Sequence, residues 1–234
     1  MRRNCLVTGA NRGIGLEFVR QLLARGEHVV AACRHPGKAT TLNGLAGEHP
    51  GRLHVLPLDV ADPKSRASLA HDLPLVLGDG GRIDLLVNNA GVLHSGERFG
   101  HVEQTILEDS LRTNAVGPLL LAQALAPWLA DGGYIANISS QLGSIGNTTR
   151  FGTPSYGISK AAQNMASVLL ARALEERGIV VLALHPGWVQ TEMGGANAQV
   201  APADAVRGLL QVIDAATPER SGSFLDWRGQ PLPL

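Results

Sequence analysis

Short runs of consecutive hydrophobic residues alternate along the chain with longer stretches in which hydrophobic residues recur at helical spacing. The runs predict seven strands: NCLVTG, HVVAAC, LHVLPLDV, IDLLVN, YIANIS, IVVLAL and GSFLDW. Several are hydrophobic at consecutive positions, as expected for parallel strands that are covered on both faces. The stretches between them predict helices near residues 13–25, 62–77, 103–130, 155–177 and 202–215.

Local signals mark several ends of these helices. Asp62 followed by Pro63 is a favourable helix start, because Asp caps the first turn and Pro fits its first position. Gly26 and Gly178 each stand between a predicted helix and a predicted strand, which suits a left-handed C-cap. The alternation predicts one α/β domain over residues 1–234, a doubly wound Rossmann-type parallel sheet of about seven strands with helices on both faces.

Composition and charge narrow the function mainly by exclusion. The chain has 20 basic and 20 acidic residues, which gives no electrostatic reason to expect nucleic acid or a membrane surface as a partner. No hydrophobic run is long enough to span a bilayer, and the N-terminus is interpreted as the first strand, not a signal peptide. Cys5 and Cys33 are expected to be buried free thiols of a cytoplasmic protein. The eight histidines lack metal-ligand spacing, so no metal site is predicted.

A glycine-rich segment, TGANRGIG, joins the first predicted strand to the first predicted helix. Glycines allow the backbone to approach a pyrophosphate, and the helix N-terminus meets its charge. The segment therefore predicts a dinucleotide site, although a glycine-rich turn without a ligand is the alternative. The expected contacts in this loop are Gly9, Asn11, Arg12, Gly13, Ile14 and Gly15.

The end of the second strand bears on which nucleotide is bound. NAD enzymes place an acidic residue there for the ribose hydroxyls, whereas this chain has Arg34, with Arg12 inside the glycine loop. Guanidinium groups bind a 2′-phosphate well, so NADP(H) is predicted in preference to NAD(H). The alternative is that both arginines are simply solvated. Further residues lie at the ends of the third and fourth strands. They are either cofactor contacts or residues of simple turns: Asp59, Val60, Asn89, Ala90 and Gly91.

The motifs TGANRGIG, NNAG, NISS, YGISK and HPGWVQT, in this order, resemble the short-chain dehydrogenase/reductases over essentially the whole chain. The segments CRHP, LGSIGN, LHPGWVQTEMGG and the ending PLPL are similar, more narrowly, to Sniffer-type carbonyl reductases and bacterial C-factor proteins. The resemblance implies an oxidoreductase that transfers a hydride between NADP(H) and a carbonyl or alcohol substrate.

Tyr156 and Lys160 lie four residues apart in a predicted helix, so both project from one face. Lowering the pKa of a tyrosine from about 10 to about 7 requires roughly 4 kcal/mol of preferential stabilisation of the phenolate. A cation about 5 Å away supplies roughly 3 kcal/mol at an effective dielectric constant of about 20. The pair therefore predicts a general acid tuned by a lysine. Without the upstream motifs, two exposed helix residues would be the simpler interpretation.

The resemblance assigns the other roles. Ser140 matches the serine that hydrogen-bonds the substrate carbonyl, with Ser139 as the alternative, and Asn114 matches an asparagine at a helix distortion that holds a water next to Lys160. Lys160 is also implied to bind the nicotinamide ribose, which predicts that Arg at this position impairs activity and cofactor affinity. The remaining implied cofactor contacts are Asn89, Pro186, Gly187, Val189 and Thr191.

The spacing between Ser140 and Tyr156 departs from the family pattern by a few extra residues, NTTRFG, which border the substrate cleft. Four hydrophobic residues are either a pocket wall or core: Leu142, Phe151, Trp188 and Met193. The helices at 103–130 and 155–177 are hydrophobic on more than one face, which indicates deep burial or an interface. The family resemblance favours a homodimer or homotetramer. A C-factor-like signalling protein with little turnover is the alternative function.

Overall fold

The computed structural model describes residues 2–78 and 80–234. Within them, seven parallel strands form one sheet in the order β3-β2-β1-β4-β5-β6-β7. The doubly wound α/β fold expected from the sequence is confirmed, and every predicted strand is present. The strands are β1 (Asn4–Thr8), β2 (His28–Cys33), β3 (Leu53–Pro57), β4 (Ile83–Asn88), β5 (Leu129–Ile138), β6 (Val180–His185) and β7 (Phe224–Asp226).

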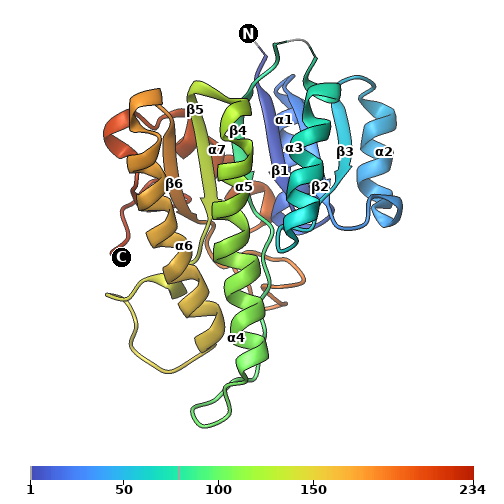
Figure 1. Cartoon of the computed structure of the whole chain (residues 1–234). Helices are drawn as coiled ribbons and strands as arrows, with labels where there is room; N and C mark the ends of the chain where they lie inside the picture. The colour runs from blue at the N-terminus through green and yellow to red at the C-terminus, as the bar shows by residue number, and fades with distance from the viewer. Residues whose placement is uncertain (1, 79) are drawn as a thin grey trace.

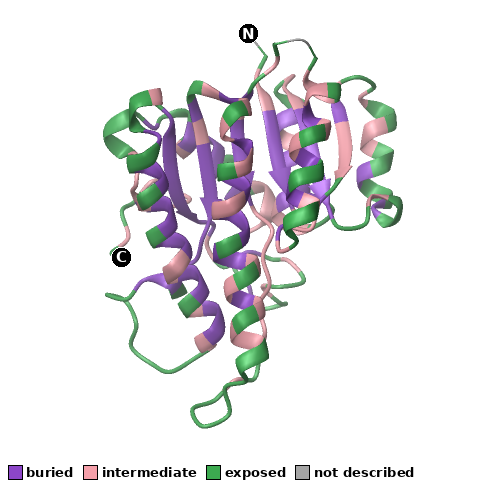
Figure 2. Cartoon of the chain, in the orientation of Figure 1, coloured by how far each residue is buried: buried purple, intermediate pink, exposed green. Residues whose placement is uncertain are grey.

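Helices cover both faces of the sheet (Figure 1). Phe18, Leu42 and Leu209 belong to the core on one face, under α1 (Gly13–Ala24), α2 (Thr40–Glu48) and α7 (Pro202–Asp214). The core on the other face lies under α3 (Pro63–Leu77), α5 (Gly117–Leu125) and α6 (Pro154–Ala173). Figure 2 shows the central strands buried between these two helical layers. Burial of this hydrophobic surface is the main force that holds the sheet and helices together.

The order of the strands reverses beside β1. Chain segments run outward from β1 to β2 and β3 on one side, and from β4 to β7 on the other. In open parallel sheets, ligands bind at the carboxyl ends of the strands where this reversal occurs. The loops that follow β1 and β4 therefore meet at the expected binding edge, and they contain TGANRGIG and NNAG.

The predicted helix over 103–130 is wrong as a single element. It divides into α4 (Gln104–Leu111), a π-helical segment (Arg112–Val116), α5 and a 3₁₀ turn (Ala126–Trp128), and β5 already begins at Leu129. The π-helical segment contains Asn114, so the local break that the sequence indicated at this residue is confirmed. Gly117 allows close packing at the junction, because a Cβ there would lie 2.9 Å from the Val60 carbonyl oxygen.

Smaller corrections follow from local chemistry. Helix α2 was not predicted, because its sequence contains two glycines and only Leu42 is buried. Strand β3 ends at Pro57, so Asp59 follows the strand instead of closing it. The helix expected over 155–177 ends at Ala173 and continues as a short 3₁₀ turn.

The predicted helix ends are confirmed. The Asp62 carboxylate accepts hydrogen bonds from the first-turn amides of Lys64 and Ser65 in α3. Gly26 and Gly178 adopt positive φ values of 83° and 64° after α1 and the turn that follows α6. Both cysteines are free and buried. Across residues 2–78 and 80–234, no helix is long and apolar enough to span a membrane, and no three metal-ligating side chains cluster together.

Candidate active site

The glycine loop is shaped by its close approach to the chain around it. Gly9 and Gly13 have φ values of 62° and 54°, which residues other than glycine rarely adopt. A Cβ on Gly15 would lie 2.3 Å from the carbonyl oxygen of Gly9 and 2.5 Å from Nδ2 of Asn89. Only glycine fits at these positions, so the TGANRGIG segment is built for a backbone that turns tightly.

Asn89 fixes this loop to the end of β4. Its Nδ2 donates to the carbonyl oxygens of Thr8, at 2.9 Å, and Gly9, at 3.2 Å. The Thr8 hydroxyl accepts in turn from the backbone amides of Asn89 and Ala90, at 3.0 Å each. The side chain of Asn89 is thus committed to holding the loop, and Ala90 lies directly against Gly9.

The N-terminus of α1 fits an anion. No side chain caps this helix and its first turn has no acidic residue, so the first amides retain their capacity to donate hydrogen bonds. Ile14 lies partly buried in this turn and Asn11 is exposed just before it. A Cβ on Gly13 would meet Cγ2 of Thr191 at 3.4 Å, so the loop that follows β6 faces this helix end.

Within that loop after β6, Pro186 and Val189 are buried. Gly187 has a φ of 84°, and a Cβ there would lie 3.0 Å from Cγ2 of Val200. The Thr191 hydroxyl accepts from the backbone amide of Gly194 at 3.1 Å. The residues predicted in this segment therefore lie in a tightly turned loop beside the glycine loop.

The basic residues predicted to select the nucleotide lie at the surface. Arg34 is exposed immediately after β2, and Arg12 is exposed in the glycine loop, where it forms an ion pair with Glu192. Asp59 is partly buried, and its carboxylate accepts from the backbone amide of Ala61 at 2.9 Å. Val60 is buried, and its carbonyl oxygen accepts from Arg66 at 2.6 Å.

Tyr156 and Lys160 lie together on the buried side of α6. The lysine Nζ is 5.6 Å from the centroid of the tyrosine ring. Ser140 lies close enough to the Tyr156 phenol to lower its pKa, whereas the Ser139 hydroxyl points elsewhere and donates to Asn164 at 2.6 Å. Of the two serines in NISS, Ser140 is the one that shares a site with Tyr156.

Burial dominates the acid–base properties of this pair. It raises the pKa of Tyr156 to about 12, against the smaller opposing effect of the neighbouring Ser140. It also lowers the pKa of Lys160 to about 7, because a buried ammonium is poorly solvated. The sequence led us to expect a phenol of lowered pKa. With protein groups alone, the phenol instead stays protonated at neutral pH.

Asn114 lies fully buried in the π-helical segment. Its carboxamide accepts from the backbone amide of Val92 at 2.8 Å and donates to the Val92 carbonyl and the Ser159 hydroxyl, both at 2.9 Å. A Cβ on Gly91 would lie 3.1 Å from Oδ1 of Asn114 and 3.8 Å from Nζ of Lys160. Gly91 is therefore the point at which Asn114 and Lys160 converge.

Comparison with known proteins identifies the family. The family model of the short chain dehydrogenases matches residues 3–201. The chain belongs to the short-chain dehydrogenase family. The C-signal protein of Myxococcus xanthus is 41% identical over 155 residues, which cover 65% of this chain and 93% of that protein.

Two solved structures are similar over the whole of both chains. The NADPH-bound carbonyl reductase from chicken fatty liver is 38% identical, with a TM-score of 0.94. The carbonyl reductase Sniffer of D. melanogaster is 33% identical, with a TM-score of 0.95. The resemblance to short-chain dehydrogenases of the Sniffer and C-factor type, expected from the motifs, is confirmed.

The hydrophobic residues expected near the substrate cleft of this short-chain dehydrogenase are not part of the core. Leu142, Phe151, Trp188 and Met193 are each 45–55% exposed. The additional residues before Tyr156 lie in an exposed loop after β5, and there Phe151 packs edge-to-face on Phe99, with ring centroids 5.6 Å apart. All four side chains are therefore exposed at the surface and not packed in the core.

Two residues of the site were missed by sequence reasoning. Glu97 accepts hydrogen bonds from the backbone amide and hydroxyl of Ser155, the residue before Tyr156. Gln163 accepts a hydrogen bond from Nζ of Lys160. A signal existed for Gln163, because it follows Lys160 by three residues and so shares its helix face. The sequence holds no signal for Glu97, which comes from a distant loop.

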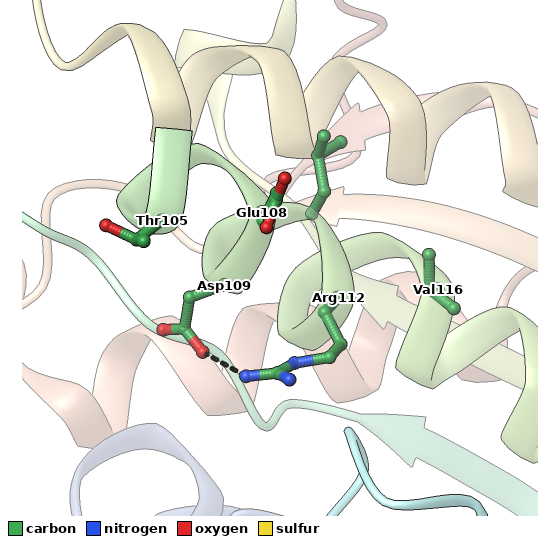
Figure 3. A pocket seen from close by; sticks show the side chains of 6 residues that line it. Thr105, Glu108, Asp109, Arg112 and Val116 are labelled. Carbon is green, nitrogen blue, oxygen red and sulfur yellow. Dashed lines mark hydrogen bonds and ion pairs between the residues drawn. The ribbon is translucent and has the colours of Figure 1, made fainter. Parts of the chain in front are cut away.

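A hollow of about 450 Å³ is lined by residues of α4 and the π-helical segment (Figure 3). Its lining includes the ion pair between Asp109 and Arg112 and the exposed side chain of Val116. This hollow opens on a helical surface that contains none of the predicted catalytic residues. The candidate active site is thus defined by Tyr156 and its neighbours.

Proposed function

We propose that this short-chain dehydrogenase is an NADP(H)-dependent carbonyl reductase or alcohol dehydrogenase in which Tyr156 is the general acid–base. The observation that carries the proposal is the buried pair of Tyr156 and Lys160 on one face of α6, with Ser140 beside the phenol. A binding module has no need of a buried acid with a lysine beside it.

The cofactor fits the residues at the binding edge. The uncapped N-terminus of α1 and the glycine loop suit a pyrophosphate, and we expect Lys160 to bind a ribose hydroxyl. Arg12 and Arg34 are exposed and can reach a 2′-phosphate, which supports NADP(H) over NAD(H). The NADPH bound to the chicken carbonyl reductase agrees with this choice. A test is the Arg34→Ala variant, whose dissociation constant for NADPH should rise while that for NADH stays unchanged.

The protein side chains perform the proton transfer. When bound, NADPH supplies the hydride for the carbonyl carbon. The Ser140 hydroxyl orients the carbonyl oxygen, and Tyr156 donates its proton to that oxygen as negative charge develops. The raised pKa of Tyr156 keeps the phenol protonated, as a general acid requires. After this proton transfer Tyr156 is a phenolate, and Lys160 stabilises that phenolate when its own side chain is protonated.

We place four exposed hydrophobic side chains at the rim of the substrate cleft, and they favour a small or medium apolar substrate. Leu142, Phe151, Trp188 and Met193 offer apolar surface to it. The test is a panel of apolar aldehydes, ketones and quinones, with consumption of NADPH as the readout. The Tyr156→Phe variant should lose at least about a hundredfold in turnover, the lower range for one general acid, and still bind NADPH. Full activity of this variant would overturn the assignment.

A second candidate function is favoured by one observation. The similarity to C-signal suggests a signalling protein that binds NADP(H) and has little turnover. In that case purified protein binds NADPH but consumes it with no member of the panel, and Tyr156→Phe changes nothing measurable.

We also propose that residues 1–234 act as one domain that pairs with a second copy through α4, α5 and α6. Val116, Ile158, Met165 and Leu169 are 43–60% exposed on these helices and the π-helical segment, and Val116 also lines the hollow of Figure 3. Light scattering after size-exclusion chromatography should give the mass of a dimer or tetramer, and Met165→Glu combined with Leu169→Glu should give a monomer. A wild-type chain that elutes as a monomer would contradict the pairing.

A further inference from the structure

Two acceptors hold the ammonium group of Lys160. Its Nζ donates to the backbone carbonyl of Ile138 at 2.8 Å and to Oε1 of Gln163 at 2.9 Å. The lysine is 4% exposed and Gln163 is 1% exposed, so water does not replace either contact. Among the described residues, Gln163 supplies the side-chain acceptor of this catalytic candidate.

Core packing does not account for a carboxamide at this position. Nε2 of Gln163 is buried and has no hydrogen-bond partner among the described residues. A buried N–H without an acceptor destabilises the folded state, and a methionine would fill the same space without that penalty. The oxygen end of the side chain, which meets Lys160, is what the site gains from glutamine.

The backbone of Gln163 is itself held in place. Its carbonyl oxygen accepts from the hydroxyl of Ser167 at 2.8 Å, and that hydroxyl accepts from Nδ2 of Asn137 at 2.8 Å. Asn137 accepts in turn from Nδ2 of Asn88, at the end of β4. This chain of buried hydrogen bonds connects Gln163 to the two central strands, and so fixes where its side chain can point.

We propose that Gln163 is a positioning residue that keeps Lys160 protonated and directed toward Tyr156. The proposal rests on the function assigned above to Lys160. The charge of Lys160 needs this support, because the groups of residues 2–78 and 80–234 that face it include no carboxylate: Tyr156 on α6, Asn114 on the π-helical segment and the carbonyl of Ile138 on β5. An acceptor stabilises an ammonium and not a neutral amine, so its removal favours loss of the proton.

The direct test measures the pKa of Lys160 by NMR of its ε-carbon. The chain has only three lysines, and Lys38 and Lys64 are exposed, so they serve as internal references. Gln163→Met should lower the pKa of Lys160 by about one unit, the size expected for one lost charge-assisted hydrogen bond, and Gln163→Glu should raise it. Equal pKa values in all three proteins would overturn the proposal. This measurement needs no turnover.

Kinetics supply the second test. The pH at which kcat/KM changes should move down in Gln163→Met and recover or move up in Gln163→Glu. Ser139→Ala is the matched control, because it removes a buried hydrogen bond to Asn164, next to Gln163 on α6, without touching Lys160 or the support of Gln163. An unchanged profile in Gln163→Met, or the same change in Ser139→Ala, would reduce Gln163 to a structural role and overturn the proposal.

The two tests also separate this proposal from the proposed function. Thermal unfolding of each variant reports whether it folds. If Gln163→Met does not fold, the NMR test is made with Gln163→Glu alone. A shifted pKa in a protein that reduces no carbonyl would support the role of Gln163 and refute the carbonyl reductase. Turnover with an unshifted pKa of Lys160 would support the carbonyl reductase and refute the role of Gln163.

Discussion

The carboxylate of Glu97 is hydrogen-bonded to Ser155, the neighbour of Tyr156. It accepts from the Ser155 hydroxyl and, at 3.3 Å, from the Ser155 backbone amide in the first turn of α6. Glu97 belongs to the loop between β4 and α4, so this contact joins that loop to the helix that contains Tyr156 and Lys160. A negative charge at a helix N-terminus is also stabilising.

The substitution Glu97→Gln should weaken this junction. Its carboxamide can still accept one hydrogen bond but lacks the charge, which predicts a loss of about 1 kcal/mol in the free energy of unfolding, measured with urea. Because the loop contacts Ser155, the residue before Tyr156, we expect kcat/KM for carbonyl substrates to fall several-fold while the dissociation constant for NADPH is unchanged. Ser155→Ala, which removes only the hydroxyl contact, should show a smaller effect in the same direction. A change in NADPH affinity alone would contradict this role.

The ion pair between Arg12 and Glu192 predicts competition at the cofactor site. Arg12 is proposed to bind the 2′-phosphate, so Glu192 must release it when NADP(H) binds. Both side chains are well exposed, and such pairs contribute at most about 1 kcal/mol. Glu192→Gln should therefore lower the dissociation constant for NADPH by up to about fivefold, as measured by calorimetry, and the gain should shrink at high salt. NADH is the control ligand, since it lacks the 2′-phosphate. A similar gain for NADH would refute the competition.

Local patterns in the sequence were sufficient to predict the strands, the glycine loop and the pair of Tyr156 and Lys160. A loop motif and an i,i+4 spacing are contained within a few residues, and their geometry follows from the helix itself. The contacts of Glu97 with Ser155 and of Arg12 with Glu192 join residues 58 and 180 positions apart, so only the folded chain reveals them. The direction of the pKa shift at Tyr156 was also missed, because it depends on how deeply the folded chain buries this side chain.

Lys160→Arg predicts a loss that charge alone does not explain. The broad guanidinium cannot occupy the buried space between the Ile138 carbonyl and Gln163 that the compact ammonium fills. We expect kcat to fall by at least about tenfold and the dissociation constant for NADPH to rise. A displaced cation would no longer interact with the Tyr156 phenol or with the ribose of the cofactor. Stopped-flow turnover and fluorescence titration measure the two effects separately. Normal values of both would refute the placement of Lys160.

Lys160→Met should make the folded protein more stable at neutral pH while abolishing turnover. Burial lowers the pKa of Lys160 from 10.5 in a solvated chain to about 7 in the folded one. The unfolded chain therefore binds more protons between pH 7 and pH 10.5, so the stability of the wild type rises with pH across this window. At or below pH 7 the full cost of the buried charge remains, up to roughly 5 kcal/mol before its hydrogen bonds offset part of it.

A methionine at position 160 carries no such cost, so its advantage over the wild type should be largest at pH 7 and should shrink as pH rises toward 10. Urea unfolding of both proteins at several pH values measures this difference directly. Lys64→Met is the matched control, because Lys64 is exposed and its substitution should leave the pH dependence unchanged. An advantage that stays constant with pH would show that packing, not the charge of Lys160, accounts for it. A methionine variant less stable than the wild type at pH 7 would show that the two hydrogen bonds of Lys160 outweigh the cost of its burial.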